Sequence, residues 1–149
     1  EDSTLTGLVE CLAEHRGLAA PPSLPERTLN GMMHGYIDLV FRWEGRHYVA
    51  DYKSTHLGNR FQDYTHNALA QDIRDHWYDL QYLIYSLAVH RYLRNRLPDY
   101  DPAHHFGGVF YLYLRGMAPE HGTGVYFNRP TDTLLDRLDR LFQREAVHG

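Results

Sequence analysis

The pattern of hydrophobic and polar positions changes its period several times along the chain. Over residues 5–16 the apolar residues recur at helical spacing, which predicts a short helix there. Gly17 ends this helix, and residues 19–25 cannot continue it because three prolines fall within five positions. Residues 1–26 are therefore predicted to form a short helix followed by a proline-rich connector.

From Thr28 onward the pattern becomes that of strands. It predicts a first strand around residues 27–33, a second over residues 35–43 and a return strand over residues 46–53. Glu44-Gly45, between the last two, is typical of a tight hairpin turn. The sequence thus predicts an antiparallel hairpin in the first half of the chain.

A two-residue loop fixes the register of this hairpin, so that Trp43 lies opposite Arg46 and Asp38 lies opposite Asp51. Because side chains alternate along a strand, the hairpin has two different faces. The face predicted to join the core carries Ile37, Leu39, Phe41, Tyr48, Ala50 and Tyr52. The opposite face carries Tyr36, Asp38, Val40, Arg42, His47, Val49, Asp51 and Lys53. A three-residue loop with a bulge would shift this pairing by one position.

The remainder of the chain alternates helices with strands. Apolar stripes predict a helix beginning near Asp63, a long helix over residues 78–97 and a final helix capped at Thr131-Asp132. The apolar run over residues 106–114 is continuous, which is typical of a strand buried on both faces, and a short strand follows at residues 125–127. This order predicts an α/β fold.

Composition and charge narrow the class of protein. With 149 residues and 43% hydrophobic composition, residues 1–149 are expected to form a single domain around one core. The formal net charge of −4 excludes a protein that coats nucleic acid through bulk positive charge. No signal peptide or membrane-spanning run is present, and Cys11 is the single cysteine, so a cytoplasmic setting is expected. The start at Glu1-Asp2, without Met, indicates a cut inside a longer protein.

One lysine stands among many arginines. Lys and Arg together number 15, and Lys53, two positions after Asp51, is the only Lys. Two carboxylates facing one another, as predicted for Asp38 and Asp51, repel unless a cation or a proton intervenes. Oxygen ligands from these two residues and a backbone carbonyl suit Mg²⁺, and a neighbouring ammonium stabilises a phosphate in its transition state. This arrangement suits metal-assisted hydrolysis of a phosphodiester.

The residues singled out above also admit interpretations without phosphodiester hydrolysis. Asp51 and Lys53 could be a surface ion pair on a solvated strand, since Asp-x-Lys is a common tripeptide. A phosphate enzyme on a P-loop or Rossmann scaffold is excluded because the chain has no glycine-rich phosphate loop. On the long helix, Arg91, Arg94 and Arg96 form either a solvated helix end or a track for phosphate.

These motifs resemble those of the PD-(D/E)XK nucleases of the RecB type. Asp38 is followed by Asp51-x-Lys53 and then by Gln81-x-x-x-Tyr85 on the next helix. Further segments that resemble the C-terminal nuclease domain of this family are residues 35–42, 78–82, 90–94 and 105–109. The resemblance covers the chain from about Thr28 to Arg129.

The resemblance implies a restriction-endonuclease-like core, with a mixed central β-sheet flanked by helices, that cleaves DNA with one or two Mg²⁺ ions, for which Mn²⁺ can substitute. By position, Asp38 and Asp51 are metal ligands, and the carbonyl of Tyr52 is a third. Lys53 is the catalytic lysine. Gln81 and Tyr85 support the site or the DNA strand.

The family context also implies parts beyond this chain. It includes an ATP-driven helicase upstream, the partners RecC, RecD and the RecA recombinase, and a role in repairing double-strand breaks in bacteria. The family takes a metal-binding His from an upstream helix. His15 and His34 are the only histidines before Asp38, and neither fits that helix and spacing. The chain is thus expected to begin after the true ligand, and a catalytically incomplete module that docks partner proteins is the alternative function.

Overall fold

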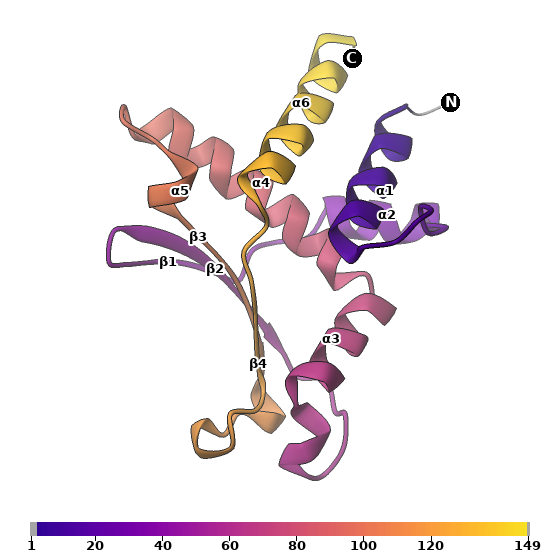
Figure 1. Cartoon of the computed structure of the whole chain (residues 1–149), viewed down its shortest axis with the longest axis vertical. Coiled ribbons are helices and arrows are strands. Elements are labelled where there is room, and N and C mark those ends of the chain that lie inside the picture. The colour runs from indigo at the N-terminus through magenta and orange to yellow at the C-terminus, as the bar shows by residue number, and fades with distance from the viewer. Residues whose placement is uncertain (1–2, 149) are drawn as a thin grey trace.

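The fold is a four-stranded mixed sheet with helices packed on one side (Figure 1). The computed structural model describes residues 3–148, and it describes side chains over residues 4–143. The strands, in the order β1-β2-β3-β4, are β1 (Leu39–Trp43), β2 (Arg46–Lys53), β3 (Phe106–Tyr113) and β4 (Val125–Asn128). β2 and β3 run parallel, and the outer pairs are antiparallel. The crossover from β2 to β3 carries the long helix across the sheet.

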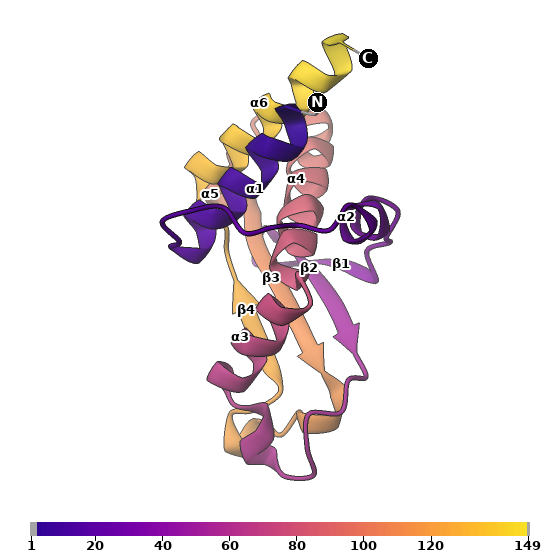
Figure 2. The ribbon, with the colours of Figure 1, turned by 90° about the vertical axis from the view of Figure 1, so that its right-hand side faces the viewer.

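The helices are α1 (Ser3–Arg16), α2 (Glu26–Met33), α3 (His66–Asp75), α4 (Tyr78–Arg96), α5 (Pro102–His105) and α6 (Asp132–His148). Short 3₁₀ turns lie at Phe61–Tyr64, Leu114–Gly116 and Pro119–His121. In Figure 2, α3 and α4 lie in front of the strands, and α1 and α6 pack on α4 beyond them. The helices predicted over residues 5–16, over residues 78–97 and after Thr131 are confirmed. Among the described residues, none of these helices has the length and apolar character needed to cross a membrane.

The predicted hairpin is confirmed in turn and register. Glu44 and Gly45 both have positive φ (50° and 80°), the geometry of a tight turn that matches the twist of the strands. Trp43 pairs with Arg46, and Leu39 pairs with Ala50. Asp38 lies one residue before β1, outside the ladder, but at the position that faces Asp51.

The strand predicted around residues 27–33 is wrong, because this segment forms α2. Its helix begins after Pro25, and Glu26 lies in the first turn, where an acidic side chain favours the helix dipole. Leu29 and Met32, three apart, pack against the core from one side of the helix. The strand predicted from Gly35 is correspondingly shorter and begins at Leu39.

The assignment of the two hairpin faces is also wrong. Asp51 is only 5% exposed and Val49 is fully buried under the helices, whereas Leu39 and Tyr52, predicted for the core, are 41% and 45% exposed. Alternation separates the two sets of side chains, but it does not say which set the helices cover. The pairing of β2 with β3 decides it, since Val49 and Asp51 align with the buried Val109 and Tyr111.

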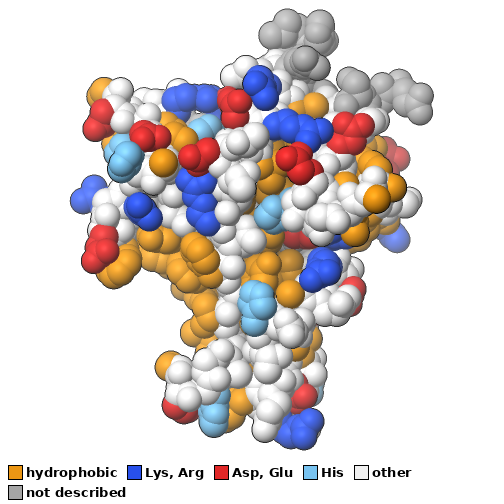
Figure 3. Space-filling model, in the orientation of Figure 1, with side chains coloured by type: hydrophobic (Ala, Val, Ile, Leu, Met, Phe, Trp, Pro, Cys, Tyr) orange, Lys and Arg blue, Asp and Glu red, His pale blue; other side chains and the backbone are white. Residues whose placement is uncertain are grey.

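The other face of the sheet carries apolar residues and no long helix. We call it the open face; its residues are Leu39, Phe41, Trp43, Tyr48, Ala50, Tyr52, Phe110, Leu112, Val125 and Phe127. Phe41 stacks on Tyr48 with 5.2 Å between the ring centroids, and Phe110 lies 4.8 Å from Phe127. Hydrophobic side chains gather on the surface over these strands (Figure 3).

The arginines at the end of α4 hold α6 in place. Asp139 of α6 is 3% exposed, and it accepts hydrogen bonds from Arg91 (2.6 Å) and Arg94 (2.7 Å). Arg96 instead lies over the ring of Tyr92. Arg91 and Arg94 therefore contribute to packing, while Arg94 and Arg96 remain exposed, as in the predicted solvated helix end. The alternative use as a phosphate track stays a prediction.

Candidate active site

The core of the candidate site lies at the carboxyl end of β2. Asp51 and Lys53 both point to the helix-covered face, because they are two positions apart on one strand. The Lys53 ammonium lies 2.8 Å from Asp51 Oδ2, and its side chain is 13% exposed. The interpretation as a solvated surface ion pair is therefore wrong: the pair is largely buried.

Asp38 reaches this pair from the segment that precedes β1. Its Oδ2 accepts a hydrogen bond from the backbone N–H of Tyr52 (2.9 Å), which fixes the carboxylate beside β2. Burial raises the pKa of the Asp51 carboxyl, and the nearby Asp38 adds to that rise, whereas Lys53 opposes it. The charge of Asp38 thus disfavours the ionised form of Asp51, in the direction the sequence predicts.

Three side chains surround Lys53 from the helix side, and we call Tyr78, Gln81 and Tyr111 the lysine cage. The ammonium lies 3.7 Å from the ring centroid of Tyr78 and 5.2 Å from that of Tyr111. It also lies 3.4 Å from Gln81 Oε1. Aromatic faces attract a desolvated cation, so the lysine cage holds the ammonium in one place.

Two members of the lysine cage were missed by the sequence reasoning. Tyr78 is three positions before Gln81 on α4, so helical spacing alone could have placed both on one side. Tyr111 pairs with Asp51 across the parallel strands, and only the pairing of β2 with β3 reveals this. Burial raises the pKa of the Tyr111 hydroxyl well above its ordinary value, so it remains a hydrogen-bond donor.

Tyr85 lies one turn further along α4 and contacts the site indirectly. Its hydroxyl donates a hydrogen bond to the backbone carbonyl of Tyr36 (2.9 Å), two residues before Asp38. Burial, followed by the charges of Asp51 and Asp38, raises the pKa of Tyr85 to about 12. Tyr85 is therefore neutral near pH 7, and it ties the segment that carries Asp38 to the helix that carries Gln81.

The predicted metal ligands fit a hard divalent cation. Asp38 and Asp51 provide oxygen donors whose mutual repulsion a dication would relieve. The side chain of Tyr52 lies on the open face, so only its backbone can take part. Over the part of the chain whose side chains are described, no cluster of three or more His, Cys, Asp or Glu side chains could hold a metal. Carbonyl oxygen and water would complete the shell, as Mg²⁺ prefers.

The two histidines before Asp38 are engaged elsewhere. His34 bonds through Nδ1 to the carbonyl of Asn30 (2.8 Å) in its own helix turn. His15 pairs with the Tyr82 hydroxyl (2.5 Å), on the side of α4 away from Gln81. The expectation that neither replaces the upstream ligand agrees with these contacts.

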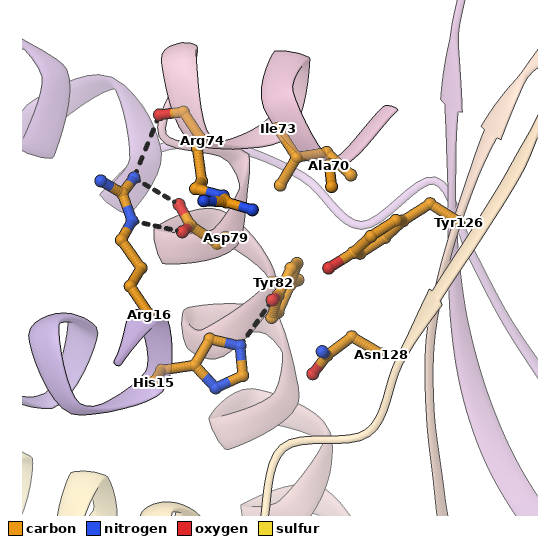
Figure 4. Close-up of a pocket in the computed structure, with 9 residues that line it drawn as sticks. All are labelled: His15, Arg16, Ala70, Ile73, Arg74, Asp79, Tyr82, Tyr126 and Asn128. Atoms are coloured by element: carbon orange, nitrogen blue, oxygen red, sulfur yellow. Dashed lines mark hydrogen bonds and ion pairs between the residues drawn. The ribbon is translucent and has the colours of Figure 1, made fainter. Parts of the chain in front are cut away.

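A cavity of about 140 Å³ lies between α1, α3, α4 and β4. Its lining, shown in Figure 4, is His15, Arg16, Ala70, Ile73, Arg74, Asp79, Tyr82, Tyr126 and Asn128. Arg16 forms two hydrogen bonds to the buried Asp79 (2.6 and 2.9 Å), so these two charges of the cavity lining are paired. None of the candidate site residues lines it, and it is separate from the site.

Comparison with known proteins agrees with this geometry. A family model described as the PD-(D/E)XK nuclease superfamily matches residues 4–148. The RecBCD enzyme subunit RecB of Escherichia coli (strain K12) is 51% identical over 125 residues, 83% of this chain. The chain belongs to the PD-(D/E)XK nuclease superfamily. Within it, the chain is a nuclease domain of the RecB type, and the predicted restriction-endonuclease-like α/β fold is confirmed.

Other relatives of this nuclease domain carry the same name. The RecBCD enzyme subunit RecB of Haemophilus influenzae is 50% identical over 120 residues, 80% of this chain. That of Mycobacterium tuberculosis is 37% identical over 166 aligned positions, 99% of this chain. The alignments span only 11%, 10% and 15% of the three relatives, so this chain corresponds to a small part of each.

Proposed function

We propose that this nuclease domain hydrolyses phosphodiester bonds of DNA with Mg²⁺ held by Asp38, Asp51 and the carbonyl of Tyr52. The observation that carries the proposal is a pair of neighbouring carboxylates, one of them beside a largely buried lysine: Asp51 lies 2.8 Å from Lys53, and Asp38, bonded to the Tyr52 amide, is close enough to raise the pKa of Asp51. One or two ions can be accommodated, and Mn²⁺ can substitute, because all the proposed ligands are hard oxygens.

Each residue has a distinct part in this proposal. Asp38, Asp51 and the Tyr52 carbonyl would hold the Mg²⁺, which would supply polarisation of the phosphoryl oxygen and acidification of a water molecule. Asp38 and Asp51 orient the ion, and Lys53, held by the lysine cage, places a positive charge beside the phosphate where negative charge develops. Gln81 contacts the lysine, and Tyr85 keeps the Asp38 segment in register with α4.

A metal titration tests the site. We expect the domain to bind Mg²⁺ or Mn²⁺ in calorimetry and to cleave single-stranded DNA only in its presence. Asp51→Ala should abolish both properties, whereas Asp75→Ala, which changes an exposed carboxylate on α3, should leave both unchanged. Retention of metal binding by Asp51→Ala would show that the ligands are elsewhere.

The lysine has its own prediction. Lys53→Ala should lower the cleavage rate by about 100-fold or more, because the charge beside the reacting phosphate is lost. Metal binding should be retained, since the proposed ligands are untouched. A fully active Lys53→Ala variant would remove Lys53 from the mechanism.

The wider role is also a proposal, and it rests on the names of the relatives. We infer that the domain is part of a longer RecB-type helicase-nuclease of the bacterial cytoplasm, whose ATP requirement belongs to a helicase part outside this chain. It would work with RecC and RecD, and with the RecA recombinase, in repairing and recombining broken DNA. Purification of the parent protein as a complex with both subunits would support this role.

A second candidate function is a docking module without catalysis. The open face favours it, since a contiguous apolar surface of this kind marks an interaction site. The two functions separate in one assay: a domain that binds partner protein but neither Mg²⁺ nor Mn²⁺ is a docking module.

A further inference from the structure

Gln81 is held in one orientation by its two neighbours. Its Oε1 accepts a hydrogen bond of 2.7 Å from the Tyr111 hydroxyl and lies 3.4 Å from the Lys53 ammonium. A lysine ammonium can only donate, so the amide group of Gln81 must turn its oxygen, not its nitrogen, toward Lys53. The donor-only Lys53 ammonium therefore supports the orientation that the structure gives the Gln81 side chain.

The amide nitrogen of Gln81 points away from both partners. Nε2 forms no hydrogen bond with any of the described side chains or with the described backbone. It is also absent from the small set of buried polar atoms without a partner, which comprises His47 Nδ1 and Asn128 Oδ1 within the described residues. The amide nitrogen is thus not fully buried, and its two N–H donors have no partner among the described residues.

Tyr111 is the residue that fixes this arrangement. It is completely buried in β3, so its hydroxyl cannot move with the substrate. Its register opposite Asp51 ties the position of Gln81 to the strand that carries Asp51 and Lys53. The hydroxyl also lies 3.2 Å from the carbonyl of Tyr78, which keeps it directed at the first turn of α4.

We propose that Tyr111 is a positioning residue of the nuclease: its hydroxyl holds the Gln81 carbonyl toward Lys53 and so aims the Gln81 N–H groups at the phosphate of the DNA strand. This inference rests on the proposed function of the same site. Anionic phosphate oxygens accept such donors, and a donor held in place before the substrate binds costs no reorganisation during the reaction.

Tyr111→Phe removes only the hydroxyl, and Tyr113→Phe is its matched control. Tyr113 is equally buried two positions later on the same strand face, but its hydroxyl donates to Asp72 (2.7 Å), outside the lysine cage. We expect Tyr111→Phe to lower kcat about tenfold, with KM for single-stranded DNA and the half-saturating Mg²⁺ concentration within about twofold. Tyr113→Phe should retain kcat, although it loses a hydrogen bond to a buried carboxylate.

A double-mutant cycle tests whether Tyr111 acts through Gln81 or only stabilises the surrounding structure. Gln81→Ala should lower kcat by about tenfold or more, and adding Tyr111→Phe to it should have no further effect, since Tyr111 acts through Gln81. Additive losses in the double variant would overturn the proposal. Gln81→Glu keeps an oxygen for Lys53 but has no N–H donors, so it should be as slow as Gln81→Ala. A Gln81→Glu variant with wild-type kcat would also overturn the proposal.

A readout independent of cleavage distinguishes this inference from the proposed function. In a ¹⁵N–¹H spectrum of the chain, the side-chain NH₂ signals of Gln81 should shift in Tyr111→Phe and remain in place in Tyr113→Phe. Unchanged signals in Tyr111→Phe would overturn the inference whether or not the domain cleaves DNA. If the Gln81 signals shift but the domain does not cleave DNA, the proposed function is overturned. Tyr111 would then orient Gln81 in a domain without nuclease activity.

Discussion

At the scale of single residues, the buried His90 and the partly buried His15 make the stability of the domain depend on pH. His15 pairs with the Tyr82 hydroxyl (2.5 Å) and His90 with the Tyr100 hydroxyl (2.6 Å). Burial is the main cause that lowers the pKa of both imidazoles from the ordinary value of 6.5. Each is therefore neutral in the fold under conditions in which the unfolded chain takes up a proton.

The free energy of unfolding should accordingly fall as the pH drops below about 6.5, since the unfolded state then binds more protons than the folded state. Above that pH the contribution is fully present. Urea denaturation at a series of pH values checks this, and His15→Gln combined with His90→Gln should flatten the dependence. The exposed His56→Gln is the control, and an equal flattening by that change would contradict the assignment.

The residues of the site could largely be predicted from the sequence, because spacing alone relates them. Asp51 and Lys53 share a strand face in any register, and Gln81 and Tyr85 share a helix face. Tyr111 could not be placed in this way. Its position depends on which strand pairs with β2, and that pairing joins residues about sixty positions apart in the chain.

At the scale of elements, the contact between α4 and α6 depends on one carboxylate. Burial alone would raise the pKa of Asp139, but hydrogen bonds from Arg94 and Arg91 outweigh it and hold the pKa below its ordinary value. Both arginines are partly exposed, so water compensates some of the loss when the carboxylate is removed.

Asp139→Asn should lower the free energy of unfolding by about 2 kcal/mol, because a charge-assisted pair becomes a neutral amide in a buried position. Chemical denaturation measures the change. Asp136→Asn, in an exposed pair with Arg140 on the same helix, should cost no more than about 0.5 kcal/mol. Equal losses in the two variants would mean that Asp139 has no special part in docking α6.

The elements that could be predicted are those whose signal is local. The Glu44-Gly45 turn and the long apolar helix α4 both follow from a few adjacent residues. The segment that forms α2 has no clear local period. Its conformation is decided by Leu29 and Met32 packing on the core, a tertiary effect that outweighs strand propensity.

At the scale of the whole molecule, the helices are distributed unevenly about the sheet. They bury the face with Asp51 and Lys53, and they leave the open face to solvent (Figures 1 and 3). All-parallel sheets are usually covered on both faces, whereas antiparallel strands tolerate one face open to water, and here that face carries exposed apolar side chains. The open face is therefore the surface on which this domain is expected to be least soluble.

The isolated domain should bind an apolar dye such as ANS through the open face. Trp43→Lys combined with Val125→Lys should reduce the dye fluorescence by about half or more, because both side chains are exposed on that face. Cleavage of DNA should be unchanged, since the site lies on the other side of the sheet. Tyr92→Lys, which places a lysine at an exposed helix position away from the open face, is the control and should leave the fluorescence unchanged.

The long crossover between β2 and β3 has a consequence for the order of assembly. Asp38 and Asp51 come together within a short hairpin, which forms early because little chain entropy is lost. The lysine cage is complete only when Tyr111 arrives, more than fifty residues later in the chain. During synthesis on the ribosome, we therefore expect the emerging chain to bring its carboxylates together before Tyr111 completes the lysine cage.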